Sequence, residues 1–334
     1  MLAPPGSAPD PQMGLKVADY RHLIDLGAPL ESGSPQETST SSLMTAPEIT
    51  ALGSSEHLSQ EELATVILGL LADQDAATRS KLSIEDLAEV PADQAAEVLR
   101  VVLTVRPAEP LPAAVDGLLA TWLHRQAQRR APVDPRRLQT LAEVAPGTAY
   151  PVADRTALWR GDITTLAADA IVNAANSALL GCFHPGHACI DNAIHAAAGP
   201  GLRADCATIM AAQGYPEPTG TAKVTRGHHL PARYVLHTVG PIVDGPLQQR
   251  HERALTAAYR SCLDVAAEVG ARTVAFCSIS TGVFGYPKAP AAHTALTTVA
   301  EWLQARPGVF DLVVFDVFSP SDENLYLDAV TSWS

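Results

Sequence analysis

The sequence predicts an α/β fold with three layers, α/β/α, around a mixed, mostly parallel sheet, preceded by a small α-helical N-terminal region. Two observations predict the layers. After residue 150, short apolar runs alternate with helical patterns. Several of these runs are apolar without alternation, which is typical of strands buried on both faces of a sheet. A third observation, helical periodicity between residues 58 and 145, predicts the N-terminal helices.

Six segments are predicted to be strands and four stretches to be helices. The strands are TALWRGDI (156–163), ADAIVNAA (168–175), TAKVTRG (221–227), RYVLHTVG (233–240), RTVAFCSIS (272–280) and DLVVFDVF (311–318). The helices are expected near 190–212, 248–269, 288–305 and 321–333. In sheets of this kind ligands bind beyond the carboxyl ends of the strands, so the functional residues are expected in the loops there.

The first 145 residues divide into two parts. Residues 1–57 are rich in Ser, Thr, Pro and Gly, which predicts disorder, with DYRHLIDLGA as a candidate short helix. A helical extension follows at 58–145. It begins with the capping signature SQEE, has a second signature SIED at 83–86, and includes a helix from about residue 112. The α/β domain is then predicted to occupy 146–334.

Composition excludes several classes of function. The 334 residues carry a formal net charge of -13, so a broad cationic surface for nucleic acid is not expected. The start, MLAPPGSAPDPQ, has neither a basic region nor an apolar core, and no segment approaches the length of a membrane span. We therefore expect a cytoplasmic protein without a membrane partner. The five cysteines, an odd number, are expected to be free thiols that can bind metal.

Three loops have compositions that suit parts of a nucleotide. They are GDIT (161–164), SISTGVFGYPK (278–288) and VNAANSALLGCFHPGHACIDNAIHAAAGPG (172–201). In the first, Asp162 can accept a hydrogen bond from an exocyclic amine such as that of adenine, although an N-cap role is the common alternative. In the second, Gly282 and Gly285 open backbone N–H groups to an anion such as a diphosphate, and a plain tight turn is the alternative.

The third loop predicts a metal site. Cys182, His187 and Cys189 form a C-x4-H-x-C arrangement, and thiolates and imidazole are ligands that Zn²⁺ prefers. Structural zinc sites are normally closed by four protein ligands, whereas three ligands leave a position open for water or substrate. The count therefore favours a catalytic site. Two alternatives stay open: His184 or Cys206 closes a structural site, or no metal binds.

These loops, with IVNAANS, IDNAIHAAAG and GTAKVTRGHHLPARYVLHTVGP, stand in the order and spacing of macrodomains, which bind ADP-ribose. The chain resembles that family over about 155–320. GCFHPGHAC replaces the glycine run of common hydrolytic macrodomains and resembles the zinc-containing subfamily of protein ADP-ribose hydrolases. LRVVLTVRPAEPLP resembles the N-terminal extension of that subfamily. The resemblance implies a macrodomain at 146–334, a Zn²⁺ cofactor, and a mono-ADP-ribosylated protein as substrate.

The resemblance also implies roles for single residues. Asn176 and Asp191 are expected to be catalytic, with Asp191 positioning a water or acting as general base. Asn173 is expected to offer its amide to ribose hydroxyls, and Phe284 to cover the distal ribose. His195 lies one helical turn from Asp191 and is interpreted as an ordinary packed histidine. The expected ADP-ribose contacts are Asp162, Ile163, Asn176, Ile190, Asp191, Ser280, Thr281, Gly282, Val283 and Phe284.

Three functions remain open from the sequence. The first is zinc-dependent hydrolysis that releases ADP-ribose from modified protein side chains, with acidic side chains as the expected attachment point. The second is a non-catalytic module that binds ADP-ribose and leaves the modification intact. The third is hydrolysis of a small ester such as O-acetyl-ADP-ribose. The metal triad favours an enzyme over a binding module.

Overall fold

We describe the protein from a computed structural model, which covers residues 14–27, 57–74 and 90–333. Six strands form one sheet in the order β1-β6-β5-β2-β4-β3. They are β1 (Thr156–Arg160), β2 (Ala170–Ala174), β3 (Ala222–Arg226), β4 (Tyr234–Thr238), β5 (Thr273–Phe276) and β6 (Leu312–Val317). Every neighbouring pair is parallel except β3 and β4, which are antiparallel. The predicted mixed, mostly parallel sheet is confirmed.

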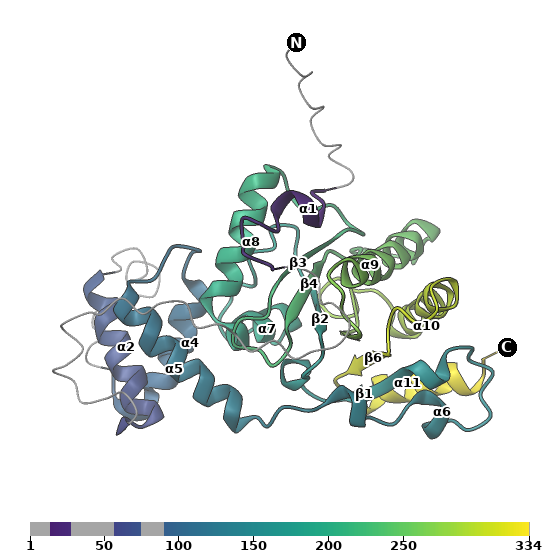
Figure 1. Ribbon diagram of the computed structural model, residues 1–334, viewed down its shortest axis with the longest axis horizontal. Coiled ribbons are helices and arrows are strands. Elements are labelled where there is room, and N and C mark those ends of the chain that lie inside the picture. The colour runs from purple at the N-terminus through teal and green to yellow at the C-terminus, as the bar shows by residue number, and fades with distance from the viewer. Residues whose placement is uncertain (1–13, 28–56, 75–89, 334) are drawn as a thin grey trace, which may run out of the picture.

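Helices cover both faces of the sheet. They are α7 (Ile190–Ala198), α8 (Pro200–Gln213), α9 (Gln249–Glu268), α10 (Lys288–Ala305) and α11 (Pro320–Thr331). Helices α7 and α8 lie on one side, and α9 and α10 lie on the other (Figure 1). The predicted helix near 190–212 is two helices, because Gly199 between them has a φ of +83°, a conformation that an L side chain rarely adopts.

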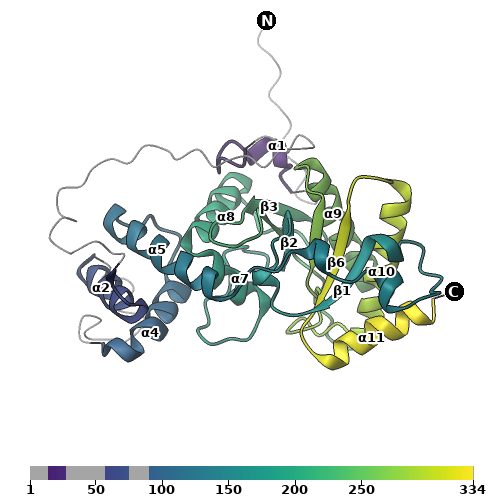
Figure 2. The same ribbon diagram turned by 60° about the horizontal axis from the view of Figure 1, so that its bottom comes forward.

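The helical extension has a core of its own. It consists of α2 (Gln60–Gln74), α4 (Ala92–Val105) and α5 (Ala113–Arg129). Helices α4 and α5 contact α7, and α2 packs against α4 and α5 (Figures 1 and 2). Its buried side chains include Leu63, Ile67, Leu68, Leu99, Val102, Val115, Leu119 and Trp122. The predicted cap SIED lies outside the described residues. A Cβ at Gly199 would stand 2.5 Å from Leu123 Cδ1, so this glycine lets α5 approach the start of α8 closely.

The segment between the helical extension and β1 contacts the sheet domain. The Val133 N–H donates to Thr165 O at 2.9 Å, which joins this segment to the loop after β1. Short helices η4 (Pro135–Arg137), α6 (Leu141–Val144) and η5 (Ala153–Arg155) then lead to β1. Leu141 and Ala145 belong to the core of the sheet domain. Residues 133–145 therefore pack with the sheet domain.

Part of the segment predicted to be disordered is ordered. Residues 14–27 include α1 (Val17–Tyr20) and pack against the sheet domain. Tyr20 is fully buried, and its hydroxyl accepts a hydrogen bond from the N–H of Val224 in the edge strand β3 at 2.9 Å. Composition averaged over 57 residues concealed the apolar face that includes Ile24 and Leu26. The rest of that segment lies outside the described residues.

Within the described ranges 14–27, 57–74 and 90–333, no helix is both long enough and apolar enough to span a membrane.

Candidate active site

The predicted site residues lie at the carboxyl ends of three parallel strands. GDIT follows β1, SISTGVFGYPK follows β5, and IVNAANS comprises the end of β2 and the three residues after it. These three strands run in the same direction. Their carboxyl ends therefore meet at one edge of the sheet. The loop that contains Cys182 and Cys189 runs from the end of β2 to the start of α7.

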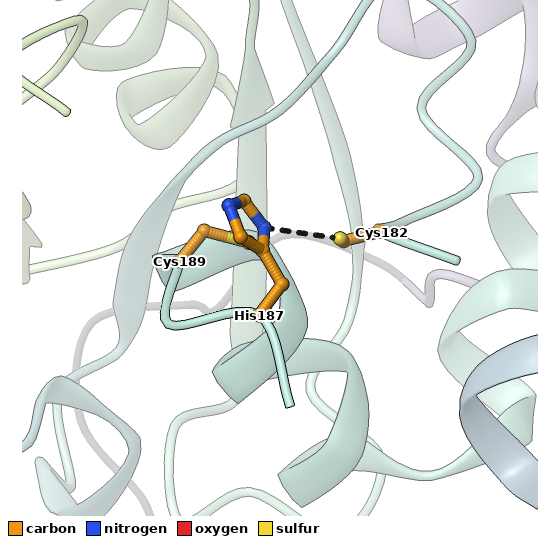
Figure 3. Close-up of side chains that lie close together, drawn as sticks. All are labelled: Cys182, His187 and Cys189. Carbon is orange, nitrogen blue, oxygen red and sulfur yellow. Dashed lines mark hydrogen bonds between the residues drawn. The ribbon is translucent and has the colours of Figure 1, made fainter. Parts of the chain in front are cut away.

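The three predicted zinc ligands converge. The ligand atoms of Cys182, His187 and Cys189 all lie within 4.8 Å of one another, and Cys182 Sγ is 3.3 Å from His187 Nδ1 (Figure 3). A tetrahedral zinc ion bound to one sulfur at about 2.3 Å and one nitrogen at about 2.1 Å separates those two atoms by about 3.5 Å. The observed spacing and donor set fit zinc.

The start of α7 holds two of these ligands. Cys189 is the N-cap residue, and its Sγ accepts a hydrogen bond from Asn192 N at 3.4 Å. The Asn192 side chain donates to His187 O at 3.0 Å and to His184 O at 3.4 Å. Burial raises the pKa of the Cys189 thiol to about 11, and the neighbouring Cys182 adds to this. A bound cation is the kind of neighbour that deprotonates such a thiol.

The two residues considered as a fourth ligand lie differently. Cys206 is fully buried, with its Sγ 3.6 Å from His237 Nε2, and belongs to a separate buried group with His195. It therefore does not close the site. His184 is nearer, with Nδ1 3.9 Å from Cys182 Sγ, but it is not a member of the convergent group found among the described residues. That group has three ligands, as the catalytic interpretation expects.

Asp191 lies in the first turn of α7, next to the half-buried Ile190, and is 5% exposed. Its Oδ1 accepts a hydrogen bond from Asn173 Nδ2 at 2.8 Å. Burial raises the pKa of Asp191 to about 6, against the lowering effects of this bond and of the Arg203 charge. Asn173 was expected to offer its amide to a ribose, but it is fully buried and also lies 3.2 Å from His237 Nδ1. Its position serves to orient Asp191.

Asn176 connects Asp191 to the metal-binding loop. Its Nδ2 lies 3.4 Å from Asp191 Oδ2 and donates to Gly181 O at 3.1 Å. Its Oδ1 accepts a hydrogen bond from Ala178 N at 3.0 Å. The two residues predicted to be catalytic therefore lie side by side, and Asn176 contacts Gly181, the residue that precedes Cys182.

His195 agrees with its interpretation as a packed histidine. It is 6% exposed, and burial lowers its pKa well below the usual value, so the ring is neutral. Its Nε2 is 3.5 Å from Asp191 Oδ1 without the geometry of a hydrogen bond. A Cβ at Gly181 would stand 2.9 Å from the ring, so the metal-binding loop rests directly on His195.

Asp162 has the N-cap role that was the alternative. Its Oδ1 accepts hydrogen bonds from Thr164 N at 3.0 Å and Thr164 Oγ1 at 2.7 Å, at the start of η6 (Ile163–Thr165). Capping does not exclude adenine recognition, because Oδ2 can still accept from an amine. Arg130 of the extension donates to the same Thr164 Oγ1 at 3.1 Å. Beside this loop, burial and then the Asp162 charge raise the pKa of Asp316 to about 8.

The predicted diphosphate loop is a tight turn with an open face. Ser280 has a φ of +65°, which is uncommon for a residue with a side chain, and Thr281 Oγ1 donates to Ser278 O at 2.9 Å. A Cβ at Gly282 would meet nothing within 4 Å, and Val283 is 76% exposed. The backbone around Gly282 is thus accessible to a ligand.

Phe284 links this turn to the metal-binding loop. Its ring packs against a small buried cluster that includes Leu179 and Cys206, and Leu180 packs against the same cluster. Leu180 is two residues from Cys182. The turn after β5 and the metal-binding loop therefore pack against the same cluster.

Sequence reasoning missed other residues at this site. Asn192 supports the ligands, Arg203 contacts the loop before Cys182, and Asp316 lies beside Asp162. Asn192 could have been found, because it lies three residues after the N-cap. Arg203 and Asp316 carry no local signal, because their partners are distant in the sequence.

Comparison with known proteins agrees with this geometry. Residues 172–295 match the Macro domain family. The chain is 42% identical over 237 residues to a protein-ADP-ribose hydrolase of Staphylococcus aureus, covering 70% of this chain and 84% of that one. It is 56% identical over 169 residues to a protein-ADP-ribose hydrolase of Treponema medium, where it spans 51% of this chain and 64% of the relative.

Solved structures show the same fold. The structure of a Trypanosoma brucei macrodomain in complex with ADP-ribose matches with a TM-score of 0.53 and 34% sequence identity, covering 69% of this chain and 94% of that chain. The α/β domain is a macrodomain, and the chain belongs to the protein-ADP-ribose hydrolase family.

Proposed function

We propose that this protein hydrolyses the bond between ADP-ribose and a mono-ADP-ribosylated protein side chain, with an Asp or Glu ester as the linkage. The observation that carries the proposal is that Cys182, His187 and Cys189 converge next to Gly181, whose carbonyl accepts a hydrogen bond from the Asn176 amide. The same amide lies 3.4 Å from Asp191 Oδ2. The names of the Staphylococcus and Treponema relatives support the same activity. A cytoplasmic location, where thiols stay reduced, suits two cysteine ligands.

In this proposal ADP-ribose lies across the carboxyl ends of the strands. Asp162 Oδ2 and the Ile163 backbone hold adenine. The turn formed by Ser280, Thr281 and Gly282 holds the diphosphate through its N–H groups. These groups bind and orient the nucleotide so that its distal ribose lies toward α7.

At the distal end, Val283 and Phe284 cover the ribose and exclude water from its outer face. Ile190 bounds the opposite side at the start of α7. Asn176 directs its amide to a ribose hydroxyl, and Asp191 holds the attacking water or accepts its proton. Asn173 keeps Asp191 in place through the 2.8 Å hydrogen bond.

We further propose that Cys182, His187 and Cys189 hold Zn²⁺. A zinc ion with an open position supplies Lewis-acid polarisation of an oxygen of the ribose or leaving group, or orients a water. The three ligands come from the loop that Asn176 and Asn192 hold in place, so the protein fixes the position of the ion relative to Asp191.

The decisive experiment measures zinc by elemental analysis together with ADP-ribose release from a protein mono-ADP-ribosylated on acidic residues, before and after chelation. We expect chelation to abolish release and added zinc to restore it. Cys182→Ala, His187→Ala and Cys189→Ala are expected to lose activity while still binding ADP-ribose. His184→Ala is the matched control, because it removes a histidine of the same loop that lies outside the triad.

Other outcomes separate the alternatives. A metal-free protein with full activity overturns the zinc proposal and leaves Asn176 and Asp191 as the site. ADP-ribose binding without release identifies a binding module. Faster turnover of O-acetyl-ADP-ribose than of the modified protein indicates a small ester as the substrate.

A further inference from the structure

One side chain beside the proposed site, Arg203, contacts both the helical extension and the metal-binding loop. Arg203 lies in α8 and is 6% exposed. Its Nη1 donates to Leu103 O at 3.0 Å and to Arg106 O, and its Nη2 donates to Thr104 O at 3.0 Å. These carbonyls end α4 of the extension, and Leu103 O has no helical donor, because residue 107 is Pro107. Arg203 therefore caps a helix of the extension from the macrodomain.

The same guanidinium holds the metal-binding loop. Arg203 Nε donates to Leu180 O at 2.8 Å, and its guanidinium carbon stands 4.4 Å from the centre of the Phe183 ring, within the range of a cation–π contact. Leu180 and Phe183 flank Gly181 and Cys182. Both sides of the segment that carries the first proposed zinc ligand thus rest on Arg203.

Most of the hydrogen-bonding capacity of the Arg203 guanidinium is used at this contact. Four of the five N–H donors of a guanidinium are used by the four carbonyls of the extension and the loop. A buried cation is costly to leave without partners, so Arg203 stays where those oxygens are. A cavity of about 60 Å³ beside it, lined by Trp122 and His195, shows that apolar packing at this junction is incomplete.

We propose that Arg203 is a positioning residue that transmits the docking of the helical extension to the Cys182 loop. The extension is then a working part of the site, because the end of α4 fixes the loop through one guanidinium. The inference rests on the proposed function, since it assigns the extension a part in the same zinc site.

The experiment compares full-length Arg203→Lys, Arg203→Met and Phe183→Leu with wild type. Lysine keeps the charge but has no planar fork for several carbonyls, and Phe183→Leu removes only the stacking contact. Arg226→Lys is the control, because Arg226 bonds Asp205 of the same helix at 2.7 Å and belongs to neither the loop nor the extension. The readouts are the rate of zinc transfer to a chromogenic chelator, amide hydrogen exchange at 179–184 in chelator-treated protein, and kcat and KM separately.

We expect both Arg203 variants to release zinc at least about tenfold faster and to exchange the amides of residues 179–184 faster. We also expect kcat to fall while KM changes less. Phe183→Leu is expected to show a smaller change in the same direction, and Arg226→Lys to match wild type. Wild-type rates of release and exchange in the Arg203 variants overturn the inference. If an Arg203 variant does not fold, Phe183→Leu decides by the same two rates.

A double-mutant comparison tests the route through the extension. Leu99→Ala makes a cavity in the core of the extension, away from the loop. Leu99→Ala is expected to speed amide exchange at 179–184 in the wild-type background and to have no further effect in the Arg203→Met background. If the effects of the two substitutions on exchange simply add, the inference is contradicted. The exchange readout needs neither zinc nor substrate. An inactive wild-type protein therefore refutes the proposed function, and an active but metal-free one refutes only the zinc proposal. An unchanged exchange rate in the Arg203 variants refutes only the role of Arg203.

Discussion

Gly282→Ala tests whether the turn after β5 binds the diphosphate. A Cβ at residue 282 would meet nothing within 4 Å, and Gly282 is not among the glycines with positive φ. Alanine therefore fits without strain in the free protein. The methyl group would instead occupy the space through which an anion approaches the backbone N–H groups.

The two effects of this substitution differ in sign. The free energy of unfolding is expected to rise slightly, by about 0.4 to 1 kcal/mol, because alanine restricts the unfolded chain. Displacing the diphosphate from a charge-assisted hydrogen bond is expected to weaken binding by about 1.5 to 3 kcal/mol. That loss corresponds to a dissociation constant about 10 to 150 times larger.

Isothermal titration calorimetry with ADP-ribose measures the second effect, and thermal unfolding of the free protein measures the first. Gly285→Ala is the matched control, because Gly285 has a φ of +69° and its added Cβ would lie 3.0 Å from Val243 O. That variant is expected to lose about 1 to 2 kcal/mol of stability. A Gly282→Ala protein that binds ADP-ribose as tightly as wild type would refute the placement of the diphosphate.

Three further predictions concern groups around the site. The pKa of Asp316 is raised to about 8 in the folded protein, above its unfolded value, so the free energy of unfolding of wild type falls as pH rises toward 8. Urea unfolding at pH 5 and pH 8 should show that this fall is roughly 3 kcal/mol smaller in Asp316→Asn. Tyr20→Phe leaves the Val224 N–H without its acceptor and should cost about 1 to 3 kcal/mol in the same assay, and an unchanged midpoint contradicts the docking of residues 14–27. Lys223→Met strands the buried Glu217 carboxylate, 2.8 Å from Lys223 Nζ, and should cost about 3 to 5 kcal/mol; adding Glu217→Gln should recover part of this, and no recovery contradicts an ion pair.

The sheet could be predicted from the sequence because its signal is local. All six strands lie within the segments predicted to be strands, and several of those segments are the unbroken apolar runs typical of strands buried on both faces. The three predicted zinc ligands converge because they lie within eight residues of one loop and a helix start, where the spacing nearly fixes the geometry.

Other features depend on contacts between distant segments. Asn173 was expected to face a ligand, but alternation along β2 turns it inward onto Asp191 and His237, and only the sheet order determines what it meets there. Arg203 meets carbonyls about a hundred residues earlier in the chain. The order of residues 14–27 likewise depends on Tyr20 reaching β3, which no short-range pattern reveals.

The position of α1 has a consequence for association between molecules. Strand β3 is the last strand of the sheet, and its antiparallel pairing with β4 uses one side of its backbone. An uncovered strand edge can add a strand from a second copy. Because the Val224 N–H already donates to the Tyr20 hydroxyl, residues 14–27 oppose such pairing. A chain shortened to start after residue 27 is therefore expected to dimerise or aggregate through β3. It would do so although it retains every residue of the proposed site.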